Sequence, residues 1–139
     1  MAKTISRKRR EYYKKQGRLI VNGVILQIHE QKTINFLLGL GYKIELIRPS
    51  YTPNSKNADF IMNGRKWEMK CPEGKSRLTM EHIIRKASHQ SENILIDLRR
   101  LRLEETLAIR QSKYEFSRRP SIKSLWLITK KEDLIVLQR

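Results

Sequence analysis

The sequence predicts one α/β domain in which helices flank a mixed β-sheet. Three observations indicate this class. Short apolar runs alternate with segments of helical periodicity along most of the 139 residues. Asn-Gly pairs at residues 22–23 and 63–64 separate apolar runs, as two-residue hairpin turns do. The chain has a single cysteine, Cys71, which excludes an internal disulfide framework, and its length is enough to bury an ordinary core.

The first half of the chain is expected to hold a basic arm, a hairpin, a helix and three strands. Residues 1–18 contain eight lysines and arginines and one acid, and we treat them as a basic N-terminal arm that precedes a single domain of residues 19–139. Gly41 ends the helix as a C-cap glycine would. The expected segments are a hairpin over 19–26, a helix over 29–40 and strands over 42–47, 58–62 and 65–71.

The second half is expected to alternate helices and strands. Met80, Ile83, Ile84 and Ala87 follow the spacing of an amphipathic helix, and Pro120 ends a later charged helix. Repeats, low-complexity segments and signs of a second domain are absent from the sequence. The expected segments are this helix, a buried strand over 93–98, a helix over 103–116 and strands over 124–129 and 133–138.

Charge is the main compositional feature. The chain carries 30 Lys+Arg against 14 Asp+Glu, a formal net charge of +16, and its sequence pI is about 10.3. Such a domain attracts polyanions, so nucleic acid is the expected partner. A soluble basic protein without a dedicated ligand is the alternative. The sequence has no apolar run long enough to span a bilayer and no secretory signal, so we expect no membrane partner. The lone cysteine fits a reducing compartment, and we expect action in the cytoplasm.

Asp59, Glu68 and Lys70 form the main candidate active site. A two-residue turn at 63–64 pairs residues whose numbers sum to 127, which places Asp59 directly opposite Glu68. Two facing carboxylates repel unless a cation lies between them, and Mg²⁺ or Mn²⁺ prefers such oxygen ligands. Lys70 shares a strand face with Glu68 and could orient a water or offset charge on a phosphate.

Glu30 adds a third acid. In the expected helix it lies on the same face as Ile34 and Leu37, where an acid needs a partner such as a metal or Lys70. Two plainer interpretations stay open. Glu30 could be an ordinary first-turn acid stabilised by the helix dipole, and Glu68-Met69-Lys70 could lie on a solvated hairpin face.

The arrangement Glu30 … Asp59 … Glu68-Met69-Lys70 resembles the PD-(D/E)xK nuclease superfamily, whose members have the restriction-endonuclease fold. Ala58 stands where the proline of that motif would be. More narrowly, residues 57–60, 67–70, 74–76 and 87–98 are similar to the C-terminal nuclease domains of contact-dependent growth-inhibition toxins. The resemblance implies Asp59 and Glu68 as metal ligands, Lys70 as the catalytic lysine and Glu30 as the helix acid. It also implies cleavage of tRNA and a cognate immunity protein, for which an acidic protein would suit this basic surface.

Further residues are candidates for substrate binding, although each also fits an ordinary solvated surface. Lys75 and Ser76 follow the catalytic strand, and three more candidates belong to the second helix and its end. The full set is Lys75, Ser76, Lys86, His89 and Gln90, with Arg9 and Arg10 of the basic arm.

We therefore expect a nuclease that hydrolyses phosphodiester bonds through a water activated by Mg²⁺, or by Mn²⁺ or Zn²⁺. Asp59, Glu68 and Glu30 would hold the metal, and tRNA is preferred over DNA as substrate because of the resemblance. A DNA endonuclease of the same fold and a non-catalytic nucleic-acid-binding protein of a phage or mobile element are the alternatives. The sequence does not give the oligomeric state.

Overall fold

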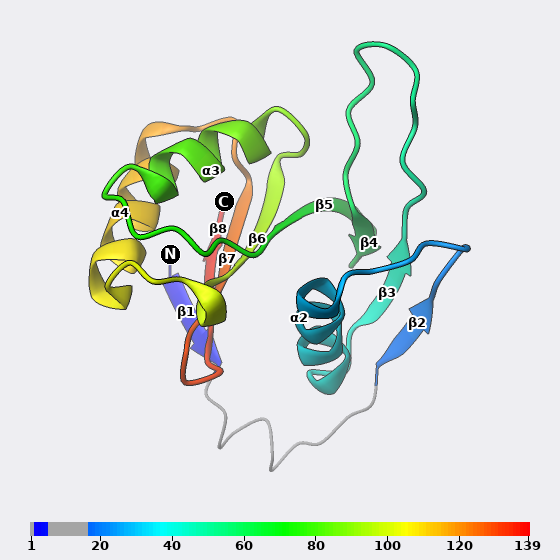
Figure 1. Cartoon of the computed structure of the whole chain (residues 1–139), viewed down its shortest axis with the longest axis horizontal. Coiled ribbons are helices and arrows are strands. Elements are labelled where there is room, and N and C mark those ends of the chain that lie inside the picture. Colours follow the sequence, from blue (N-terminus) through cyan, green and yellow to red (C-terminus); the bar gives the residue numbers. More distant parts are fainter. Residues whose placement is uncertain (1, 6–16) are drawn as a thin grey trace.

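An eight-stranded mixed β-sheet with helices on both faces forms the centre of the protein (Figure 1). This computed structural model describes residues 2–5 and 17–139. The predicted α/β class is confirmed. The strand order is β1-β8-β7-β6-β5-β4-β3-β2. The strands are β1 (Ala2–Ile5), β2 (Arg18–Ile20), β3 (Lys43–Leu46), β4 (Phe60–Met62), β5 (Arg65–Lys70), β6 (Asn93–Asp97), β7 (Ser124–Ile128) and β8 (Leu134–Gln138). The helices are α2 (Ile28–Gly39), α3 (Thr79–Ser88), the short 3₁₀ helix η1 (Leu98–Arg100) and α4 (Glu105–Arg118).

Three parallel strands, β5, β6 and β7, occupy the middle of the sheet. Parallel neighbours need crossover connections, and α3 and α4 provide them between successive strands. Every residue of β6 is buried, as expected for a central strand covered on both faces. The carboxyl ends of these three strands therefore meet at one edge of the sheet.

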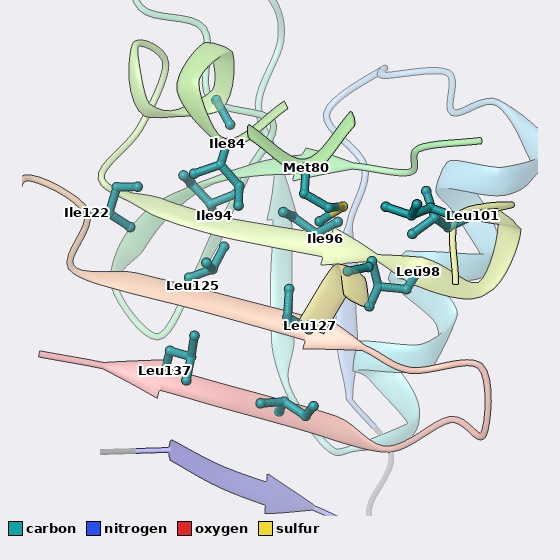
Figure 2. Close-up of a cluster of buried hydrophobic side chains, with 14 residues drawn as sticks. Met80, Ile84, Ile94, Ile96, Leu98, Leu101, Ile122, Leu125, Leu127 and Leu137 are labelled. Atoms are coloured by element: carbon teal, nitrogen blue, oxygen red, sulfur yellow. The ribbon is translucent and has the colours of Figure 1, made fainter. Parts of the chain in front are cut away.

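The sheet separates two hydrophobic cores. On one face, α3 and α4 pack over β6, β7 and β8, and Figure 2 shows Met80 and Ile84 beside Ile94 and Ile96 in this core. On the other face, α2 packs against strand residues whose side chains point away from the first core, including Trp67 of β5 and Leu95 of β6. Since successive strand residues point to opposite faces, Glu68 and Lys70 lie on the side of α3, whereas Cys71 lies on the side of α2.

The turn between β4 and β5 confirms the predicted register. Asn63 and Gly64 have positive φ angles of 55° and 71°, and Met62 pairs with Arg65. Asn and Gly adopt such angles at low cost, so this dipeptide sets the pairing of the strands that carry the candidate site.

The predicted hairpin over 19–26 is wrong. Asn22 and Gly23 do form a turn, in which the Val24 amide donates to the Val21 carbonyl at 3.0 Å. However, β2 pairs in parallel with β3, and the residues after the turn lead into α2. The reason is that Val24 and Leu26 pack against the core on the α2 side of the sheet instead of returning along β2.

The predicted division into an arm of residues 1–18 and a domain of 19–139 stays a prediction, but both described parts of that arm contribute strands to the sheet. Residues 2–5 form β1, which pairs with β8 and extends the sheet, and Arg18 begins β2. This pairing uses the edge of β8 that faces away from β7. Residues 1 and 6–16 of the predicted arm, which include Arg9 and Arg10, lie outside the described residues. None of the described helices is both long enough and apolar enough to span a membrane.

Candidate active site

Strand β5 places Glu68 and Lys70 side by side on the α3 face of the sheet. Glu68 is 5% exposed, and its Oε2 lies 3.3 Å from Lys70 Nζ. The Lys70 side chain is 35% exposed, so its ammonium can meet both the buried acid and a ligand from solvent. The structure thus brings together two of the residues that the sequence singled out.

Asp59 immediately precedes β4 and lies beside Glu68. Its backbone amide donates to the Trp67 carbonyl at 2.8 Å, and its Oδ2 accepts the Met69 amide at 2.7 Å. The expectation that Asp59 pairs directly opposite Glu68 is wrong in detail. Phe60 already pairs with Trp67, so two residues of one strand face one of the other, as in a β-bulge. The bulge turns the Asp59 carboxylate along β5, beside Glu68.

The electrostatics of Glu68 are unusual for an acid. Burial, with the hydrogen bond and negative charge of Asp59, raises the pKa of Glu68 from 4.5 to about 8, against the opposing effect of Lys70. As a carboxylic acid Glu68 can share its proton with Asp59. As a carboxylate it leaves Oε1 buried without a hydrogen-bond partner in the described part of the chain. When both acids are ionised, Lys70 supplies one positive charge against two negative charges, so the site keeps a net negative charge.

Two oxygen-bearing acids and an unpartnered, buried carboxylate oxygen fit a divalent cation such as Mg²⁺. Within residues 2–5 and 17–139, no three His, Cys, Asp or Glu side chains are grouped so that they could hold a metal ion. Asp59 and Glu68 would consequently leave most coordination positions to water and substrate, as is usual for Mg²⁺.

Glu30 is not grouped with these two acids. It lies in the first turn of α2, where its Oε1 accepts the Gln27 amide at 2.9 Å. Helix α2 packs on the face of the sheet opposite to Glu68 and Lys70, and the charge of Glu30 acts on Cys71 on that side. This position matches the plainer interpretation of Glu30, in which it is a first-turn acid that stabilises the N-terminus of its helix.

Four of the predicted substrate-binding residues lie at exposed positions. Lys75 and Ser76 belong to the loop between β5 and α3, and the Ser76 hydroxyl accepts the Leu78 amide at 3.1 Å. Lys86 and His89 are exposed at the end of α3.

The fifth of these residues, Gln90, makes a structural hydrogen bond. Its Oε1 accepts the amide of Asn57 at 2.8 Å, which ties the chain just before Asp59 to the end of α3. Gln90 is half-buried, so this bond helps to position the candidate site while part of the side chain still meets solvent.

A polar cluster that the sequence patterns did not predict lies on the other face of the sheet. Asp97, 3% exposed at the end of β6, accepts hydrogen bonds from Thr33 Oγ1 at 2.6 Å and from Arg99 Nε at 3.0 Å and Nη2 at 2.8 Å. These bonds raise the pKa of Arg99 and keep it charged. Cys71 Sγ lies 3.3 Å from the same Thr33 hydroxyl, and burial raises its pKa to about 11. The sequence signal that could have predicted this cluster is Asp97 itself. It ends an apolar strand and precedes Arg99 by two residues.

Comparisons with known proteins place the chain in a family. The family model described as the contact-dependent growth inhibition CdiA C-terminal domain matches residues 56–134, which include Asp59, Glu68, Lys70 and Asp97. No curated protein matches the chain in sequence. Among solved structures, the chain is similar to one from the CdiA-CT/CdiI toxin and immunity complex from Burkholderia pseudomallei. That likeness has a TM-score of 0.68 at 18% identity, and it covers 88% of this chain and 100% of that one, so it supports the fold. Because the family model matches more than half of the chain, the protein belongs to the family of CdiA C-terminal domains of contact-dependent growth inhibition.

Proposed function

We propose that this domain is a metal-dependent nuclease that hydrolyses phosphodiester bonds at Asp59, Glu68 and Lys70. One observation carries the proposal: a buried Glu68 whose pKa is raised to about 8 lies between a second acid and a lysine. Lys70 compensates only one of the two negative charges, so the ionised site favours a further cation more than a purely structural role would.

The residues fit a cation, and Mg²⁺ is our first choice, with Mn²⁺ and Zn²⁺ as alternatives. Asp59 and Glu68 would hold it. When bound, such an ion lowers the pKa of water and stabilises negative charge on phosphate oxygens. Asp59 is held for this role by the Met69 amide, and Glu68 is held by the strand pairing of β5 on both sides.

Lys70 has two roles in this proposal. Its ammonium, 3.3 Å from Glu68 Oε2, reduces the repulsion between the acids while no substrate is bound. Because its side chain is partly exposed, it can also turn toward the scissile phosphate, hold the attacking water by a hydrogen bond and offset the charge that develops on the phosphate oxygens.

Nucleic acid is the proposed substrate, and tRNA is preferred over DNA. The net charge of +16 supports a polyanion in general. The preference for tRNA rests on the resemblance to growth-inhibition toxins. We also propose a toxic effector role in the cytoplasm of a target cell, with neutralisation by an acidic immunity protein. Membership of the CdiA C-terminal family and the likeness to a chain of a toxin and immunity complex support this role.

Cleavage assays test the proposal directly. The purified protein is incubated with total tRNA, plasmid DNA and single-stranded DNA in Mg²⁺, in Mn²⁺ and in EDTA, alongside Glu68→Gln, Lys70→Ala and the control Lys113→Ala. Lys113 is an exposed residue of α4. Metal-dependent cleavage that both site variants lose and the control retains supports the nuclease. Equal binding by all four proteins without any cleavage would show a nucleic-acid-binding protein without catalysis.

A further inference from the structure

A polar cavity lies on the face of the sheet away from the candidate active site. It has a volume of about 490 Å³ and is bordered by the first turns of α2 and by the chain that leaves β6. Its lining residues are Ile28, His29, Lys32, Asp97, Arg99 and Arg100. Ligands of open α/β sheets commonly bind beyond the carboxyl ends of the strands, which is where this cavity lies.

The Arg99 side chain in this cavity is held in one orientation by its contacts. Its Nε and Nη2 groups donate to Asp97, and Nη2 also donates to the Lys32 carbonyl at 3.1 Å. Its guanidinium also lies over the Phe36 ring, 5.3 Å from the centroid. One edge of the guanidinium is thus fixed, while Nη1 makes no hydrogen bond to the described residues. A fixed arginine with unused donors binds an anion at a low entropic cost.

The charges of the lining favour an anion. Arg99 neutralises Asp97, and Arg100 forms an ion pair with Glu73. Lys32 is exposed and forms no ion pair with any residue of 2–5 or 17–139, so its charge remains uncompensated. His29 and Lys32 also lie in the first two turns of α2, where the helix dipole favours negative charge.

We propose that this cavity binds a backbone phosphate of a nucleic-acid strand, as a site distinct from the catalytic residues on the other face. The two sites meet at the end of β5. Cys71, which follows Lys70, contacts Thr33, and Thr33 in turn binds Asp97. A strand that passes around this end of β5 can reach both sites. The identity of the ligand as nucleic acid rests on the proposed function, whereas the phosphate chemistry follows from the lining residues.

The histidines provide a direct test, because the chain has only three of them. His29 lines the cavity, whereas His82 and His89 are exposed at α3 on the other face. The imidazole Cε1–H signals are followed by NMR in EDTA during titration with a thymidine dinucleotide, with inorganic phosphate and with thymidine. We expect a saturable shift of the His29 signal with the dinucleotide, a weaker one with inorganic phosphate and none with thymidine.

Charge reversal at Lys32 provides the matched variant. Lys32→Glu keeps the main-chain carbonyl that holds Arg99, and Lys113→Glu makes the same charge change on α4. Lys32→Glu should weaken the binding that shifts His29 by about tenfold or more at low salt, and Lys113→Glu by much less. Unchanged folding of both variants is checked by circular dichroism.

The outcomes separate this inference from the proposed function, because the titration needs neither metal nor cleavage. A dinucleotide that shifts only His82 or His89, or equal weakening by the two variants, would overturn the phosphate site even if the protein cleaves tRNA. A His29 response that Lys32→Glu removes would support the site even if the protein cleaves nothing.

Discussion

Replacing Glu68 by glutamine tests the electrostatic cost of the candidate active site. The pKa of Glu68 is raised in the folded state, so the folded protein binds a proton more tightly there than the unfolded chain does. The folded state is therefore favoured by this group at a pH below 4.5, and that contribution is lost progressively as the pH rises to about 8. Glutamine keeps the shape of the side chain and removes its ionisation.

The size of the effect follows from the interval between the two pKa values. Between 4.5 and about 8, each pH unit is worth about 1.4 kcal/mol, so the wild type loses at most about 5 kcal/mol of stability through this group. The advantage of Glu68→Gln over the wild type should grow across this range and level off above about pH 8. In a domain whose total stability is about 5–15 kcal/mol, such a change is easily measured.

Urea unfolding in EDTA at intervals from pH 5 to pH 9 measures the free energy of unfolding of both proteins. Glu92→Gln is the control, because Glu92 is exposed immediately before β6. Addition of Mg²⁺ at pH 8 should stabilise the wild type, since a ligand that binds only the folded state adds to its stability, and should leave Glu68→Gln nearly unchanged.

Parallel pH profiles for Glu68→Gln and the wild type would refute the argument, because the variant would then have removed no perturbed ionisation. Equal stabilisation of both proteins by Mg²⁺ would show that Glu68 does not hold the ion.

Three further changes are informative. Lys70→Ala should reduce cleavage by about 10²–10⁴-fold without a matching loss of tRNA binding in gel shifts, because the charged surface supplies most of the affinity; loss of binding in proportion to activity would contradict this. Asp97→Ala leaves Arg99 unpaired and should cost about 2–4 kcal/mol in urea unfolding, with some relief because Arg99 is 24% exposed; a change below about 1 kcal/mol would show that the pair is unimportant. Glu30→Ala removes the acceptor of the Gln27 amide and should cost about 0.5–1 kcal/mol while cleavage stays within a few-fold of wild type; a loss as large as that of Lys70→Ala would assign Glu30 to catalysis.

Local patterns predicted the elements that carry their own signals. The helices over 29–40 and 103–116 occur as α2 and α4 with small changes at their ends, and the strand register around Asn63-Gly64 is as expected. These features depend on periodicity and turn chemistry between neighbouring residues. The hairpin at 19–26 failed because an Asn-Gly turn determines where the chain reverses but not which strand the next residues pair with.

The candidate site shows the same division. The alternation of a strand placed Glu68 and Lys70 on one face, and that prediction needed only their spacing. The bulge at Asp59 depends on hydrogen bonds with Trp67 and Met69, so spacing alone misplaced its carboxylate.

The sequence by itself determined the α/β class, the basic charge and the neighbourhood of Asp59, Glu68 and Lys70, because composition and short-range geometry are properties of the chain. Only the tertiary structure decided that α2 covers the opposite face of the sheet, where Glu30 forms no metal-binding group with the other acids among the described residues and where Asp97 meets Arg99 and Thr33. The choice of face depends on which apolar surfaces pack together across long separations in sequence, and a local pattern carries no information about it.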